Sequence, residues 1–272
     1  MSFLVTQMTP LYLPSPRDRP LITASLNRDL HRINSWCMRW GMQINPSKTK
    51  GMVISRSRTR YPSFPDFVLD GEIVQVVDKL MVLGVLIDSK LTFEAQLRSL
   101  AVSASKKLGI LRKAVSVFRD TSLVERCFWS FLLPVMEYCS PVWMSAATCH
   151  LNLLDKIVRS ASRLSGGRIT CNLEHRRNVA SLCMFYKIRG NQSHSVHSLI
   201  PPARGARRAT RGALAAHSLS LEMPRARTEQ FSRSFVPAVS SCWNSLDEVC
   251  FAGDGLASFK SSVNRCLLAR LN

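Results

Sequence analysis

The sequence predicts an α+β protein in which a small antiparallel sheet with one packed helix is followed by a mostly helical chain. Short apolar runs bounded by turn residues lie between about residues 50 and 90. From residue 92 onward, apolar residues recur every three or four positions, as in amphipathic helices. The hydrophobic content of 46% over 272 residues is enough for a folded core.

The first predicted helix follows a proline-containing lead-in. Residues 1–20 carry four prolines and no helical period, so we expect this segment to be poorly ordered. Thr23 or Ser25 is a candidate helix cap, and Gly41 suits a left-handed helix end. The apolar positions between them share one helix face: Leu26, Leu30, Ile33, Cys37 and Trp40.

Short strands and turns are predicted after this helix. A basic turn at residues 46–50 precedes an apolar strand at residues 52–55. The pair Asp70 and Gly71, between two runs rich in β-formers, predicts a tight hairpin. Residues 80–87 are apolar almost throughout and predict a covered strand, with Gly84 at a close approach.

Three helices are predicted between residues 92 and 165. The first has a buried face and an opposite basic face, and the third is closed by Gly166 and Gly167. The second, over residues 121–138, should be kinked by Pro134. The apolar positions predicted to face inward in the first helix are Phe93, Leu97, Leu100, Ala104, Leu108, Leu111 and Val115. Those of the second are Val124, Cys127, Phe128, Phe131 and Leu132, and those of the third are Leu154, Ile157, Val158, Ala161 and Leu164.

A basic region follows residue 167. Residues 168–233 contain 12 Lys and Arg and only three acidic residues. Residues 173–187 still have a helical pattern, whereas residues 199–212, with two prolines and several arginines, predict an exposed basic linker. The aromatic residues of the last 45 positions predict two short closing helices.

The charge balance of 37 Lys and Arg against 18 Asp and Glu gives a net charge of +19. A net positive charge of this size favours nucleic acid or an anionic membrane as partner, and the alternative is a basic surface without such a partner. The apolar windows are too short to span a bilayer, so we expect nucleic acid and no membrane. The odd count of nine cysteines indicates reduced thiols, and the N-terminal residues lack the basic and long apolar regions of a signal peptide. We therefore expect an intracellular protein of the cytoplasm or nucleus, not a secreted one.

No motif in the sequence predicts a metal or an active site. There is no C-x-x-C pair, and the nearest candidate ligands do not have the spacing of a compact finger: Cys149, His150, Cys171 and His175. There is no glycine-rich phosphate loop, nucleophile elbow or H-E-x-x-H. A new metal site at Asp70, Glu72 and Asp88 is a weaker interpretation than turn and strand-end roles. We expect no metal and no cofactor in this chain.

Several short sequence segments, which occur in the same order as in a known family, carry a resemblance to that family. They include Leu-Asn-Arg-Asp-Leu at residues 26–30 and Trp-Gly-Met-Gln-Ile-Asn-Pro-Ser-Lys-Thr-Lys at residues 40–50. The others stand at residues 53–58, 83–93, 108–112, 133–143, 174–177, 227–231 and 243–246. Over residues 21–272 the chain resembles the C-terminal part of the reverse transcriptase of non-LTR, LINE-type retrotransposons, nearest to the jockey-like groups.

This resemblance implies a division of the chain and a set of site residues. Residues 21–90 would be the end of an incomplete reverse-transcriptase palm, 91–167 a helical thumb, and 168–272 a basic C-terminal region. Motif D would comprise Asn45, Lys48 and Lys50, and the primer grip Leu83, Gly84 and Val85. The residues expected to contact RNA, an RNA–DNA hybrid or DNA are Lys106, Lys107, Arg112, Lys113, Arg204, Arg207, Arg208 and Arg211. No specific protein partner follows from the sequence.

The catalytic aspartates of the resembled family are not found in this chain. In that family two aspartates hold Mg²⁺, and by alignment they would stand at Gln7 and Met8, whose side chains are poor ligands for a hard cation. The codons of residues 5–9, read in a shifted frame, can encode Tyr-Ala-Asp-Asp, which suggests a frameshifted catalytic turn. We therefore expect a truncated RNA-directed DNA polymerase that is inactive alone. The alternatives are a nucleic-acid-binding module without catalysis and, less well supported, an enzyme active with a complementary chain.

Overall fold

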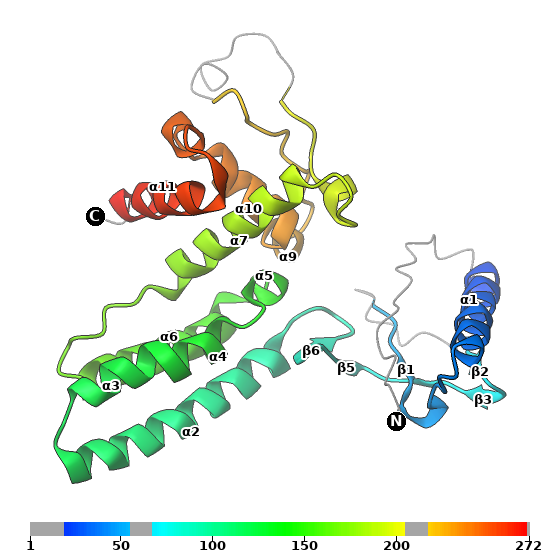
Figure 1. Ribbon diagram of the computed structural model, residues 1–272, viewed down its shortest axis with the longest axis horizontal. Helices are drawn as coiled ribbons and strands as arrows, with labels where there is room; N and C mark the ends of the chain where they lie inside the picture. Colours follow the sequence, from blue (N-terminus) through cyan, green and yellow to red (C-terminus); the bar gives the residue numbers. More distant parts are fainter. Residues whose placement is uncertain (1–18, 55–66, 205–216, 271–272) are drawn as a thin grey trace. The chain divides into compact units, whose positions relative to one another are not determined.

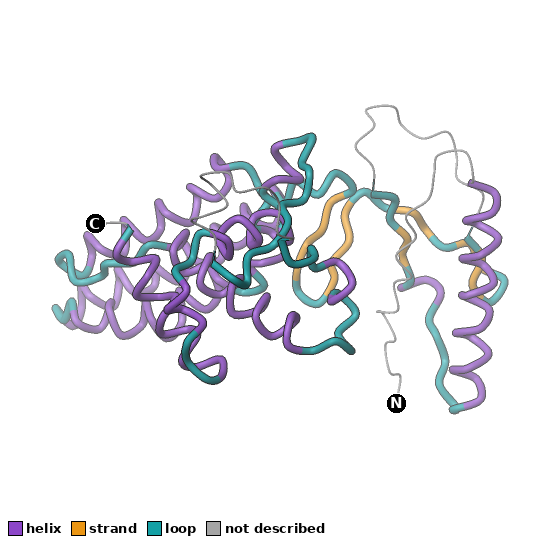
Figure 2. Tube along the Cα trace, turned by 90° about the horizontal axis from the view of Figure 1, so that it is seen from above, coloured by secondary structure: helices purple, strands orange, loops and turns teal. Residues whose placement is uncertain are grey.

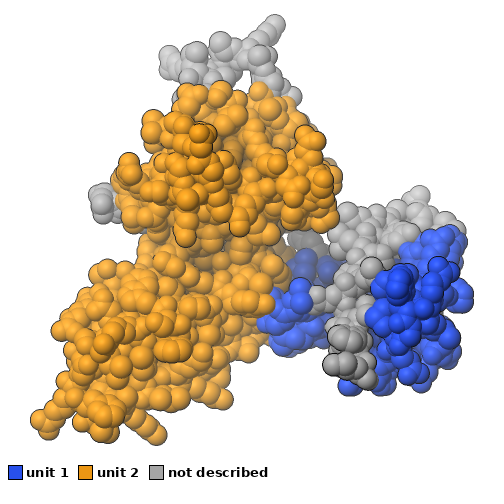
Figure 3. Space-filling view, in the orientation of Figure 1, with its two compact units in different colours: residues 1–91 blue, residues 92–272 orange. Residues whose placement is uncertain are grey.

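The computed structural model describes residues 19–54, 67–204 and 217–270, which form an α+β protein (Figure 1). Two compact units divide the chain after Leu91, as Figure 3 shows: residues 1–91 and residues 92–272. The predicted lead-in lies outside the described residues except for Arg19 and Pro20, which begin the first helix. Within the described ranges, no helix is long and apolar enough to cross a membrane.

Helix α1 (Arg19–Arg39) begins before the predicted caps and ends where expected. Thr23 is buried inside the helix instead of capping it, since Pro20 already starts the first turn, where proline is tolerated. At the other end Gly41 has φ +65°, and the Met42 N–H donates to the Cys37 carbonyl at 2.9 Å. Cys37 is buried as predicted, but Trp40 is 66% exposed, because it follows the last helical residue and the helical period no longer applies.

The strands of the first unit form three separate pairs, so the prediction of one small antiparallel sheet is wrong (Figure 2). After the short 3₁₀ helix η1 (Pro46–Lys48), β1 (Lys50–Gly51) pairs in parallel with β4 (Gln75–Val76). Between them, β2 (Val68–Leu69) pairs antiparallel with β3 (Glu72–Ile73). The strand predicted at residues 52–55 is wrong over residues 52–54, since β1 ends at Gly51, and Ser55 lies outside the described residues. Strands of two to four residues are too short to join into a wider sheet.

Two tight hairpins shape this unit. Asp70 and Gly71 have φ of 53° and 81°, the two positive values that a type I′ turn requires, so the predicted hairpin is confirmed. A second hairpin joins β5 (Lys79–Val82) to β6 (Val85–Asp88), and its turn residues Leu83 and Gly84 also have positive φ. The single covered strand predicted at residues 80–87 is therefore wrong, because Gly84 supplies a turn.

Helices α2 (Glu94–Phe118) and α6 (Thr148–Leu164) pack along each other in the second unit. The buried residues include most of the predicted inward positions: Phe93, Leu97, Ala104, Leu108, Leu154, Ile157, Val158 and Ala161. Both helices are confirmed, because a period of 3.6 residues specifies one buried face without help from distant residues.

The helix predicted at residues 121–138 is divided into three pieces. α3 (Ser122–Cys127) continues into a π-helical turn, η2 (Phe128–Leu132), and then into α4 (Leu133–Glu137). The Leu133 N–H donates to the Phe128 carbonyl, and Pro134 next to it has no N–H to continue the usual ladder. Phe131 was predicted inside and is 62% exposed, because the wider turn carries an extra residue and rotates the side chains that follow.

The remaining helices gather around a second apolar core. α5 (Ser140–Trp143) precedes α6, and the long α7 (Leu173–Gly190) is followed by η3 (His197–Leu199) and α9 (Glu229–Ser232). The chain ends with α10 (Phe235–Asn244), η4 (Glu248–Phe251) and α11 (Gly255–Ala269), and both α10 and α11 contact α7 (Figure 1). Phe185, Trp243 and Phe259 bring these three helices together. The predicted helix at residues 173–187 and the two closing helices are confirmed.

Candidate nucleic-acid interface

The face of α2 that points away from its buried side alternates lysines with large apolar side chains. Val102, Lys106, Ile110, Lys113 and Val117 follow one another at intervals of three or four residues, and all are exposed. Val102, Ile110 and Val117 are 55%, 68% and 73% exposed. We call these five residues the α2 stripe. Arg112 lies next to Lys113 and is exposed as well.

Positive charge on this face is not neutralised within the described chain. After Glu94, helix α2 contains no acidic residue, and Glu94 pairs with Arg98 at 2.7 Å. Among the described residues, no ion pair involves Lys106, Arg112 or Lys113. The helix therefore presents a row of cations whose charge no described acidic residue neutralises.

Lys107 differs from its three predicted neighbours. Its side chain is half-buried, and its Nζ donates to the Phe131 carbonyl at 3.5 Å. This contact ties α2 to the π-helical turn η2. Lys107 therefore connects α2 to η2 and also adds positive charge to the surface.

The α2 stripe has the chemistry of a surface that reads the shape of a duplex. Ammonium groups contact phosphates without distinguishing bases, and methyl groups pack on sugars. The minor groove of an A-form duplex is wide and shallow and displays the 2′-hydroxyls of the sugars together with the base edges. Alternating lysine and aliphatic side chains match both features, whereas no residue of the stripe can hydrogen-bond a base edge through an amide or carboxylate.

The predicted motif D residues occupy the turn at η1. The Asn45 Oδ1 accepts the Lys48 N–H at 3.2 Å and the Ser47 hydroxyl at 2.6 Å, so this side chain shapes the turn. Lys48 and Lys50 are exposed, and Lys50 is held by its place in β1. The turn thus presents two lysines, while Asn45 has a structural role.

The predicted primer-grip residues occupy the turn of the β5–β6 hairpin. Leu83 is 69% exposed with φ 45°, a value that leucine rarely adopts, and Gly84 beside it is also exposed. Val85 is 3% exposed and anchors the start of β6. The hairpin therefore presents a large apolar side chain at its tip.

Two of the three carboxylates weighed as a metal site, Asp70 and Asp88, accept hydrogen bonds within the first unit. The Asp70 Oδ1 accepts from the Asn34 amide at 3.3 Å, and the Asp88 Oδ1 accepts the Lys90 N–H at 3.1 Å. In the part of the chain that the structure describes, no three His, Cys, Asp or Glu side chains lie close enough to hold a metal ion.

The four candidate zinc ligands also have other environments. His150 lies 3.9 Å from Glu94, and His175 Nε2 lies 2.8 Å from Asn264 Oδ1. Cys149 is exposed, whereas burial raises the pKa of Cys171 to about 11. The candidates therefore do not form a metal site.

The predicted basic linker is described only in part. Arg204 is exposed, and its backbone N–H donates to the Ser220 carbonyl at 2.8 Å, beside a β-bridge between Ala203 and Leu221. The other residues expected at functional positions lie outside the described residues: Gln7, Met8, Arg207, Arg208 and Arg211.

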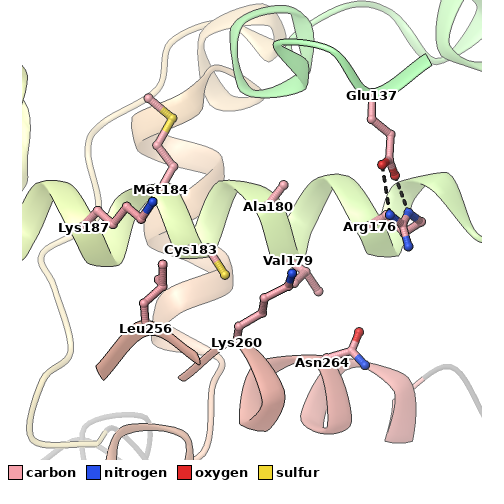
Figure 4. Close-up of a pocket in the computed structure, with 10 residues that line it drawn as sticks. All are labelled: Glu137, Arg176, Val179, Ala180, Cys183, Met184, Lys187, Leu256, Lys260 and Asn264. Atoms are coloured by element: carbon pink, nitrogen blue, oxygen red, sulfur yellow. Dashed lines mark hydrogen bonds and ion pairs between the residues drawn. The ribbon is translucent and has the colours of Figure 1, made fainter. Parts of the chain in front are cut away.

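A cleft that the sequence analysis did not find lies between α7 and α11 (Figure 4). Its volume is about 520 Å³, and it carries Lys187, Lys260 and Arg176. Arg176 is paired with Glu137 through two hydrogen bonds, one of them 3.0 Å between Nη2 and Oε2. This pairing raises the pKa of Arg176. The helical spacing of Arg176, Ala180 and Cys183 was visible in the sequence, but nothing local indicated that α11 would face it.

Comparisons of this chain with protein-family models, with curated proteins and with solved structures found no match.

Proposed function

We propose that this chain is the C-terminal part of a non-LTR retrotransposon reverse transcriptase and that its own residues hold a template–primer duplex. The observation that carries the proposal is the α2 stripe, in which lysines that pair with no described acidic residue lie beside exposed aliphatic side chains on one long helix face. The ordered sequence phrases described above support the family. The net charge of +19 supports nucleic acid as the partner.

The described carboxylates do not fit the metal ions that nucleotide transfer requires. Two-metal catalysis needs several carboxylates converging on one place. Asp70 and Asp88 are instead engaged by Asn34 and by the Lys90 N–H, and no group suited to a metal occurs in the described ranges. We therefore assign duplex binding, and no step of nucleotide transfer, to the residues that the structure describes.

The binding role is tested with Lys106→Gln and Lys113→Gln combined. Affinity for a labelled RNA–DNA hybrid is measured by fluorescence anisotropy between 50 and 200 mM salt. Each lost phosphate contact lowers the slope of log K against log salt by about 0.9 on B-form DNA, so we expect a reduction of roughly 1.5 to 2. The matched control combines Lys156→Gln and Arg159→Gln, which removes two exposed charges from α6.

Two outcomes would contradict the binding role. One is no hybrid binding by the unmodified chain at 50 mM salt. The other is an equal loss of slope in the α6 control, which would show a non-specific charge effect. A primer-extension assay with Mg²⁺ or Mn²⁺ tests the missing catalysis separately: we expect no template-dependent synthesis, and any synthesis would overturn that part of the proposal.

A further inference from the structure

The cleft between α7 and α11 has apolar walls on a rigid base. Val179, Ala180 and Met184 line it from α7, and Leu256 lines it from α11. Behind it, Tyr186 of α7 stacks on Phe259 of α11 with ring centroids 4.4 Å apart and planes inclined by 20°. This stacking is part of the apolar core through which α7 and α11 pack together.

Two lysines that form no ion pair with any described residue line this cleft. Lys187 comes from α7 and Lys260 from α11, and Figure 4 shows Cys183 between their ammonium groups in that view. Burial raises the pKa of the Cys183 thiol, and both lysines act in the opposite direction, which places their charges near the sulfur. In the described ranges neither lysine forms an ion pair. The Glu137 carboxylate, which also lines the cleft, forms an ion pair with Arg176.

A buried histidine orients a hydrogen-bond donor at the same cleft. His175 is 8% exposed, and its Nε2 lies 2.8 Å from Asn264 Oδ1. Because the amide oxygen only accepts, the Nε2 carries the proton of this bond, and the buried Nδ1 has no hydrogen-bond partner among the described residues. The Asn264 Nδ2 is thereby left available to donate at the cleft.

From this arrangement we infer that the cleft binds one nucleotide unit of a single-stranded nucleic acid, with its phosphate between Lys187 and Lys260. The sugar and base would lie against Val179, Met184 and Leu256, and Asn264 would donate a hydrogen bond at the rim. This inference goes beyond the duplex-binding function, because it concerns other helices and another form of nucleic acid.

The dimensions of the cleft favour a single strand over a duplex. A volume of about 520 Å³ is in the range of pockets that enclose one small ligand. Grooves that combine cations with surfaces for bases and sugars are typical of single-strand binding.

The experiment measures protection of Cys183 in the full chain. The protein is alkylated with iodoacetamide, with and without hexauridylate, and labelling of each cysteine is followed by peptide mass spectrometry. We expect hexauridylate to slow labelling of Cys183 at least about threefold and to leave the exposed Cys149 unchanged. Combining Lys187→Gln and Lys260→Gln should abolish the protection. It should also reduce the salt slope of hexauridylate binding by about 1.4, or about 0.7 for each lysine.

Controls separate this inference from duplex binding. The ratio of labelling with and without ligand is compared, because removing the lysines also changes the reactivity of the free thiol. In the α6 control variant, hexauridylate should still protect Cys183 fully. The same is expected of the variant that combines Lys106→Gln and Lys113→Gln. The cleft variant should keep its affinity for the RNA–DNA hybrid, so either function can fail while the other stands.

Three results would overturn the inference. The first is no protection of Cys183 in the unmodified chain at hexauridylate concentrations that saturate binding. The second is full protection in the Lys187 and Lys260 variant. The third is equal protection by uridine monophosphate or by a hairpin duplex at the same concentration, which would identify a free nucleotide or a duplex as the ligand.

Discussion

Trp243 organises the core that positions α7, and its replacement by phenylalanine should destabilise the second unit. The side chain is 1% exposed and packs against Phe185, Phe251 and Phe259. Its Nε1 donates to the Leu219 carbonyl at 3.0 Å, and Arg189 lies over the ring at 5.2 Å. Trp243→Phe keeps an aromatic ring but loses the hydrogen bond and part of the volume.

The cost can be worked from these contacts. The Leu219 carbonyl also accepts from Arg189 at 3.1 Å, so the mutation does not leave it without a partner. Losing one hydrogen bond then costs about 1 kcal/mol. A void of a few tens of Å³ adds about 1 kcal/mol at about 24 cal/mol per Å³. We expect a loss of about 2 kcal/mol and a fall in Tm of about 4–8 °C for a unit of this size.

Urea denaturation followed by far-ultraviolet circular dichroism measures the change, since tryptophan fluorescence would lose part of its own signal. Trp36→Phe is the matched control, because Trp36 is 50% exposed on α1 and should change stability by less than about 0.5 kcal/mol. A loss below about 0.5 kcal/mol for Trp243→Phe would refute the reasoning. A loss above about 4 kcal/mol would show that the ring does more than fill space and hold one carbonyl.

Three further predictions concern local contacts. A double-mutant cycle on Glu137→Gln and Arg176→Gln should give a coupling of about 1 kcal/mol, because the pair is bidentate but partly exposed; additive effects would contradict it. Gly71→Ala should cost about 1–2 kcal/mol because Gly71 has φ +81°, while the control Gly109→Ala, in an open position of α2, should be neutral or stabilising. Finally, Cys171 has a pKa of about 11 against 9.0 for an ordinary thiol. From pH 9 to 11 the unfolded thiol therefore loses its proton first, and the free energy of unfolding should fall with pH. The urea midpoint of the unmodified chain should decline more steeply over this range than that of Cys171→Ala, and parallel declines would argue against the burial of this thiol.

Features set by nearby residues were predictable from the sequence. The buried faces of α2 and α6 were correct because a helix repeats every 3.6 residues, and the hairpin at Asp70 was correct because its turn needs two residues with positive φ. The same reasoning failed at Trp40, where the helix had ended, and at Phe131, where a π-helical turn changed the spacing. Periodicity does not report where a regular element stops or gains a residue.

The candidate binding residues also fall into a part that the sequence predicted and a part that it did not. The basic row on α2 could be read from the sequence, because Lys106 and Lys113 lie on one helix and their common face follows from their spacing. The cleft could not, because Lys187 and Lys260 belong to different helices that meet only through the core around Trp243 and Phe259. Likewise, the pairing of Lys50 with Gln75 in parallel strands joins residues that are far apart along the chain. Amino-acid order specifies the faces of single elements, whereas which faces meet is decided by packing over long separations along the chain.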